Sequence, residues 1–145
     1  MSASVGLYSS HLITEEELRN VIRQAGGVVT PEGPHFGRIS QEMTHVWIIP
    51  SEPYNGIFDH DGEPFHQSDV DLLDRAKEII GGEFQTWISI LLSTTSGSQR
   101  LAVLFAHTCC QRWPCVVDND QGQLFSCEEI AKLHEEGGGF TTYGL

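Results

Sequence analysis

Apolar residues recur with the spacing of a helix in three segments of the chain, and each segment begins at a hydroxyl residue and ends at glycines. An acidic residue follows each hydroxyl three positions later: Glu17 after Thr14, Asp71 after Ser68 and Glu129 after Ser126. A hydroxyl and a carboxylate at this spacing can accept hydrogen bonds from the free amides of the first helical turn. Glycine readily takes the left-handed conformation that ends a helix. The pattern predicts helices over residues 14–26, 68–81 and 126–137.

A fourth helix is predicted from residue 96 or 98 to Trp113. Its apolar residues leave it hydrophobic on most of its circumference, which is typical of a helix that packs against a sheet. They are Leu101, Ala102, Leu104, Phe105, Ala106, Cys109 and Cys110. The residue before a proline disfavours helical backbone, so we expect the helix to end before Pro114.

Between the helices lie short runs that are rich in β-branched and aromatic residues and therefore predict strands. The expected strands are residues 5–12, 36–39, 44–49, 86–92, 115–118 and 123–125. Trp47, Trp87 and Trp113 lie in or beside apolar elements, and we expect them in the core. Helices that alternate with strands predict an α/β or α+β fold, with a mixed β-sheet covered by about four helices in a single domain over residues 1–145.

Charge sets the chain apart from an average soluble protein. Its 145 residues include 8 Lys and Arg against 20 Asp and Glu, a formal net charge of -12. A field of this sign repels nucleic-acid phosphates and anionic lipid headgroups, so we expect neither nucleic acid nor a membrane as a direct partner. A protein with a basic face is the expected class of partner.

The N-terminal segment and the cysteines bear on the compartment. Residues 1–13 show no basic region followed by a long apolar core, and no apolar run approaches the ~20 residues that span a bilayer. We therefore expect a cytoplasmic protein. Its four cysteines, Cys109, Cys110, Cys115 and Cys127, are expected as reduced thiols, because the cytosol is reducing and adjacent cysteines rarely bridge each other.

Residues 50–67 are rich in proline and glycine, predict a long loop and hold candidates for metal chemistry. The metal-ligating side chains are Asp59, His60, Asp61, Glu63 and His66. They suggest a small metal-dependent enzyme as an alternative function. However, His60 interrupts the alternating oxygen ligands that a calcium loop requires, and a solvated acidic turn explains the same residues.

Motifs for other chemistry are missing from the sequence. The cysteines lack the paired C-x2–4-C spacing of structural zinc sites, and there is no G-x-S-x-G elbow or Walker A loop. Cys115 could pair with His107 or His134 as a nucleophile, although the first residue of a buried strand is the simpler interpretation of this cysteine. We therefore expect no catalytic residues, no cofactor and no enzymatic activity.

Carboxylates beside aromatic residues indicate a protein interface instead, because such aromatics are typical anchors and opposite potentials speed association. The residues expected to bind a partner are Tyr54, Phe58, Asp59, Asp61, Glu63 and Phe65 in the loop, then Asp118 and Asp120 at the tip of the predicted hairpin. A structural role is the alternative for many carboxylates. Acidic residues in first helical turns complement the helix dipole, and aspartates form turns.

Three segments near the C-terminus carry a resemblance to known proteins: residues 112–122 (RWPCVVDNDQG), 124–126 (LFS) and 128–130 (EEI). They resemble the closing segment of small bacterial proteins, several of which are encoded beside secreted toxins. More broadly, the chain resembles the acidic immunity proteins of interbacterial toxin systems. The resemblance covers about the last third of the chain. It implies a cytosolic antitoxin that binds one cognate toxin domain and occludes its active site or substrate cleft. Immunity families share no catalytic residues, so none are assigned.

Overall fold

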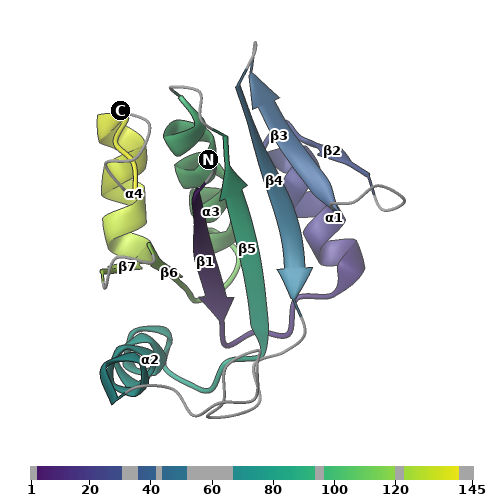
Figure 1. Cartoon of the computed structure of the whole chain (residues 1–145). Helices are drawn as coiled ribbons and strands as arrows, with labels where there is room; N and C mark the ends of the chain where they lie inside the picture. The colour runs from purple at the N-terminus through teal and green to yellow at the C-terminus, as the bar shows by residue number, and fades with distance from the viewer. Residues whose placement is uncertain are drawn as a thin grey trace.

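Strands and helices alternate along the chain as the hydrophobic pattern predicts. The computed structural model describes residues 3–30, 36–41, 44–51, 67–93, 97–119 and 123–140. In chain order the elements are β1 (Ala3–Ser9), α1 (Glu15–Gln24), β2 (Val28–Val29), β3 (Gly37–Gln41), β4 (Thr44–Ser51), α2 (Gln67–Ile80), β5 (Thr86–Leu92), α3 (Ser98–Cys110), β6 (Cys115–Asp118), β7 (Leu124–Ser126) and α4 (Cys127–Glu136) (Figure 1). Each predicted helix and strand has a counterpart in this list, and β2 was not predicted. No helix within the described residues is long and apolar enough to cross a membrane.

All seven strands join one sheet, in the order β2-β3-β4-β5-β1-β6-β7. The predicted α+β class with its four helices is confirmed, but every neighbouring pair is antiparallel, so the sheet is not mixed. The helix α3 does connect two parallel strands, β5 and β6, as a βαβ unit would. However, β1 lies between them and runs antiparallel to both, which leaves no parallel neighbours.

One face of the sheet packs against three helices and carries the larger core. Along β5, buried residues alternate with half-buried ones, and Ile88 and Ile90 are fully buried. Helices α1, α3 and α4 add Val21, Phe105 and Ile130 to the same cluster. The helix α3 contacts both neighbouring helices as well as the sheet, which explains why it is apolar on most of its circumference.

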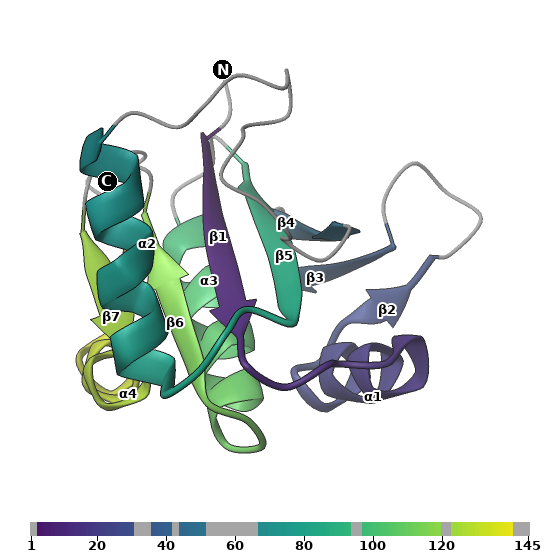
Figure 2. The ribbon, with the colours of Figure 1, turned by 90° about the horizontal axis from the view of Figure 1, so that it is seen from below.

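The opposite face carries only one described helix, α2, which lies across β6 and β7 (Figure 2). Its cluster is small and consists of the buried residues Tyr8, Ala76, Ile80, Phe84 and Val116. On this side of the sheet Trp47 and Trp87 are half-buried, whereas Trp113 is buried in the larger cluster, so only Trp113 is fully in the core as expected.

The two outer capping boxes form as the sequence predicts. The Thr14 side chain accepts a hydrogen bond from the Glu17 amide, and the Ser126 side chain accepts one from the Glu129 amide. At the end of α4, Gly137 takes the left-handed conformation at φ 70°. By contrast, α2 begins at Gln67, one residue before the expected cap Ser68. The first and last helices are therefore specified locally.

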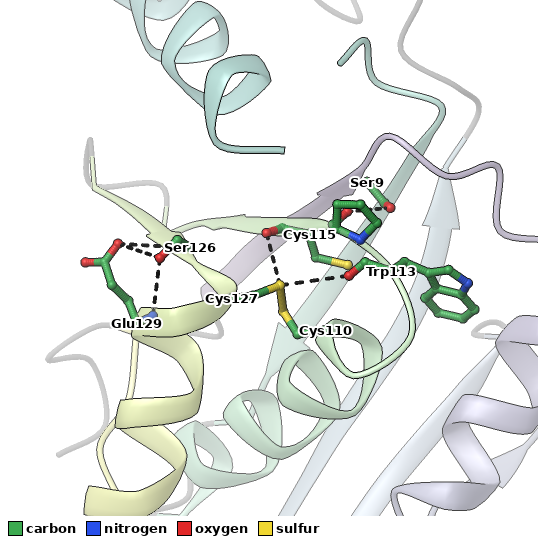
Figure 3. The surroundings of a disulfide bond; sticks show 8 residues. Ser9, Cys110, Trp113, Cys115, Ser126, Cys127 and Glu129 are labelled. Carbon is green, nitrogen blue, oxygen red and sulfur yellow. Dashed lines mark hydrogen bonds between the residues drawn. A yellow bond between two sulfur atoms is a disulfide. The ribbon is translucent and has the colours of Figure 1, made fainter. Parts of the chain in front are cut away.

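The expectation of four reduced thiols is wrong, because Cys110 and Cys127 form a disulfide (Figure 3). Their Cα atoms lie 5.5 Å apart although the two cysteines are 17 positions apart in sequence. The hairpin β6–β7 returns the chain, so the start of α4 meets the end of α3. The Cys127 sulfur also lies 3.4 Å from the carbonyl oxygen of Cys115. The disulfide thus joins α3 to α4 beside the hairpin.

Candidate functional site

The structure places only one of the residues that were predicted to bind a partner. Tyr54, Phe58, Asp59, Asp61, Glu63, Phe65 and Asp120 lie outside the described residues. The metal-ligating candidates Asp59, His60, Asp61, Glu63 and His66 lie outside them as well. The chain from Ser51 to Gln67 joins the end of β4 to the start of α2. The remaining residue, Asp118, is the last residue of β6.

Asp118 lies on the face of the sheet that α2 covers. It is two residues beyond Val116, which is buried beneath α2, and side chains alternate between faces along a strand. Its Cα partners are Gly6 in β1 and Leu124 in β7. The structure therefore brings Asp118 next to the last strand of the sheet.

Asn119 fixes the base of the hairpin. Asn119 is 1% exposed, and its side-chain amide donates to the carbonyl oxygen of Phe140 and to the Gln123 side chain, each at 2.8 Å. In return, the backbone amide of Gln123 donates to Asn119 Oδ1 at 3.2 Å. These bonds hold β7 in register with β6 up to its first residue.

A groove of about 450 Å³ lies where β7 meets α2 and α4. Its lining residues are Arg75, Glu78, Ile79, Gln123, Leu124, Phe125 and Glu129. We call this the β7 groove. Ile79 is 40% exposed there, which is unusual for an isoleucine in a small protein. The apolar floor comes from Ile79, Leu124 and Phe125, and the rim is charged.

The sequence builds the β7 groove through two local features. On α2, Ala76 and Ile80 are buried against the sheet, which turns the adjoining Glu78 and Ile79 outwards. On α4, the capping box holds Glu129 at the start of the helix. Glu129 Oε1 accepts hydrogen bonds from the Ser126 amide at 3.1 Å and from the Ser126 hydroxyl at 3.2 Å.

Negative charge dominates both helices that border the β7 groove. The helix α2 has four acidic and two basic residues, and α4 has four acidic and one basic residue, which gives the pair a net charge of -5 with histidine neutral. Of the basic residues, Lys77 is engaged away from the groove, with its Nζ 3.1 Å from Glu83 Oε2 and 5.7 Å from the centre of the Phe84 ring. The β7 groove therefore has an apolar floor, and Glu78, Glu129 and Arg75 line it beside two helices with a surplus of acidic residues.

An apolar cleft of about 430 Å³ at the far end of the sheet is an alternative docking surface. Leu12 borders it and is 57% exposed. However, the acidic residues near it are already paired: Glu15 contacts Arg19 at 2.6 Å, and Glu17 contacts His11 at 3.1 Å. The helix beside this cleft, α1, has a surplus of one acidic group, against five for the two helices that border the β7 groove.

The two free thiols, Cys109 and Cys115, are buried. Burial raises the pKa of the Cys115 thiol to about 12, and burial also raises that of Cys109, so neither is a nucleophilic thiolate at neutral pH. His107 and His134 stack with their ring centres 4.5 Å apart, and burial lowers the pKa of His107. Within the described residues, no three His, Cys, Asp or Glu side chains gather where they could hold a metal ion.

Comparisons with protein-family models, with curated proteins and with solved structures gave no match. The function is therefore inferred from the fold and the charge of the chain itself.

Proposed function

We propose that this chain is an immunity protein, which binds a cognate secreted bacterial toxin and occludes the active site or substrate cleft of that toxin. The observation that carries the proposal is the β7 groove, where an apolar floor is bordered by two helices with a net charge of -5. The net charge of -12 over the whole chain acts in the same direction. The proposal assigns binding to the chain and no reaction.

The chemistry of the toxin follows from that charge. A domain that acts on nucleic acids or nucleotides presents basic groups where phosphates bind. Carboxylates can occupy such a cleft in place of phosphates, and complementary potentials raise the association rate. Ile79, Leu124 and Phe125 supply apolar surface that can be desolvated at the centre of an interface, where most binding energy arises.

The decisive experiment combines this protein with the C-terminal domain of a secreted protein encoded beside it. Co-production of the two should restore growth to cells that the toxin domain alone arrests. The purified pair should form a complex whose dissociation constant rises at least tenfold between 50 and 300 mM salt, because charges at the rim drive the encounter.

A matched pair of charge reversals tests the location. Glu78 borders the β7 groove, and Glu16 is exposed on α1 at the other end of the sheet. We expect Glu78→Lys to raise the dissociation constant of the complex at least tenfold at low salt, and Glu16→Lys to change it less than threefold. Unchanged binding by Glu78→Lys, or no binding to the toxin domain, would contradict the proposal. Stoichiometric zinc, iron or manganese in the purified protein would favour the metal-dependent enzyme instead.

A further inference from the structure

We infer that the outer edge of β7 is a docking strand, on which an extended basic segment of the partner pairs as an eighth strand between α2 and α4. This inference rests on the proposed function and adds how the toxin is held.

The place of β7 in the sheet supports this mode of binding. β7 is the last strand of the order, so one of its edges has no partner strand within the described sheet. The helix α2 packs on one face of the sheet, and α4 packs with α3 on the other. Figure 2 shows β7 at the border of the sheet with α2 across it. Because the β7 groove is lined by both helices and by β7, it runs along this outer edge.

The direction of the backbone groups along β7 determines which amides and carbonyls its outer edge presents to a partner strand. The carbonyl oxygen of Gln123 accepts from the Asn119 amide at 3.2 Å, so Gln123 is directed towards β6. The next residue, Leu124, is therefore directed outwards, because backbone groups alternate along an antiparallel strand. The Ser126 amide confirms this phase, since it also points outwards, to Glu129 Oε1.

A partner strand would therefore be centred on Leu124. The amide and carbonyl of Leu124 face outwards, whereas the outward amide of Ser126 is already occupied by the capping carboxylate. Edge strands present such rows of backbone groups to incoming chains, and many recognition domains bind peptides in this way. Here the capping box limits the pairing to a short segment and fixes its register.

Side chains around the edge define the chemistry of the segment. Glu78 and Arg75 from α2 and Glu129 from α4 line the groove, and the acidic surplus of both helices favours lysine or arginine in the partner. Ile79, Leu124 and Phe125 favour aliphatic residues between the basic residues of the partner. An extended segment that alternates basic and aliphatic side chains presents the basic ones on one face, beside Glu78 or Glu129, and the aliphatic ones on the other, because successive side chains of a strand point to opposite faces.

The other edge of the sheet does not provide the same charge. There β2 has only two residues, Val28 and Val29. The nearby helix α1 carries three acidic and two basic residues, a surplus of one acidic group. The charge surplus that would attract a basic strand is thus at β7.

The first test uses a blocked peptide that alternates lysine and valine over seven residues, and an analogue whose valine amides are N-methylated. We expect the unmodified peptide to shift the NMR signal of the Leu124 amide and to slow its hydrogen exchange at least tenfold at saturation. The methylated analogue should bind at least tenfold more weakly, because it lacks the amides that pair with β7. No binding, equal binding of both peptides, or shifts that leave Leu124 unchanged would overturn the inference.

The second test uses the toxin domain with two variants at one position. Leu124→Pro removes the outward amide from an edge position where proline is tolerated, and Leu124→Val keeps the amide. We expect the proline variant to lose at least tenfold in affinity relative to the valine variant, with both checked for folding by thermal unfolding. If the toxin binds both variants equally, the immunity function stands and strand pairing falls. If the peptide pairs with β7 but no toxin binds, the docking strand stands and the proposed function falls.

Discussion

The face of the sheet beneath α1, α3 and α4 differs from the face beneath α2 in how deeply it is covered. The first face holds a continuous cluster whose buried residues come from five strands and three helices, and a disulfide links two of those helices. The second face has a cluster of five buried residues under α2. The β7 groove lies at the border of this second face. The comparison indicates that stability comes from one side of the sheet, which leaves the other side free to carry charge and exposed apolar residues for binding.

Two phenylalanine truncations would break or support this comparison most directly. Phe105→Ala removes a fully buried ring from α3, and we expect a loss of about 4 kcal/mol in the free energy of unfolding. Phe84→Ala acts on the small cluster, where the ring is 5% exposed and contacts Tyr8, and we expect about 2 kcal/mol because that site can relax. Urea denaturation measures both. Equal losses would mean that the two faces contribute alike.

Removing the disulfide tests the second element of the deeply covered face. Cys110→Ala with Cys127→Ala opens a link across 17 residues of sequence, and we expect a loss of about 3 kcal/mol from the greater freedom of the unfolded chain. Reductant should destabilise the natural protein by a similar amount and leave the double variant unchanged. A count of four free thiols in the unreduced, unfolded protein would contradict the disulfide.

The two capping boxes sharpen the comparison because they are alike in structure and differ in place. Thr14→Ala and Ser126→Ala each remove a side chain that accepts from a first-turn amide, and we expect each to cost about 1 kcal/mol in urea denaturation. Only Ser126 holds the Glu129 carboxylate at the β7 groove. We therefore expect Ser126→Ala to weaken toxin binding as well, and Thr14→Ala to leave it unchanged. Equal effects on binding would remove the assigned role of the cap at the groove.

The smallest expected effect concerns pH and the contact between α3 and α4. Burial, and then the charge of His134, lower the pKa of His107 below its ordinary value of 6.5. The unfolded chain therefore binds a proton at His107 before the folded chain does. The contribution of neutral His107 to stability is complete above pH 6.5 and declines as the pH falls through its lowered pKa. Urea denaturation at pH 7.5 and 5.0 should show the decline, and His107→Gln should reduce it. An undiminished decline in the variant would assign it to other groups.

Local signals in the sequence were sufficient for most elements of the fold. The capping pair Ser126 and Glu129 located the start of α4, and the β-branched and aromatic residues over 86–92 located β5. These features depend on residues that are close in sequence. The antiparallel sheet was missed because it depends on where β1 inserts, and no local pattern encodes that position.

The candidate site was less predictable than the fold, for a related reason. The number of cysteines does not reveal their pairing. The link between Cys110 and Cys127 could be predicted only from the path of the hairpin, which brings the start of α4 to the end of α3. The β7 groove combines Ile79 with Leu124 and Phe125, which are far apart in sequence. A sequence signal existed only for part of it, in the acidic residues of α2 and α4. Of the predicted binding residues, Asp118 was placed near the groove through its pairing with Leu124.

The position of β1 has a consequence for how the chain is made. The strand β1 precedes in sequence both strands with which it pairs, β5 and β6, and Leu7 lies opposite Ile88 on one side and Val117 on the other. Neither neighbour exists until residues 86–92 and 115–118 have been synthesised. The apolar residues Val5 and Leu7 therefore remain without these neighbours until both strands are made, and contacts of such long sequence separation form slowly. Assembly of this sheet must await β6, and a nascent chain that stalls before residue 115 is the species that chaperones would have to shield.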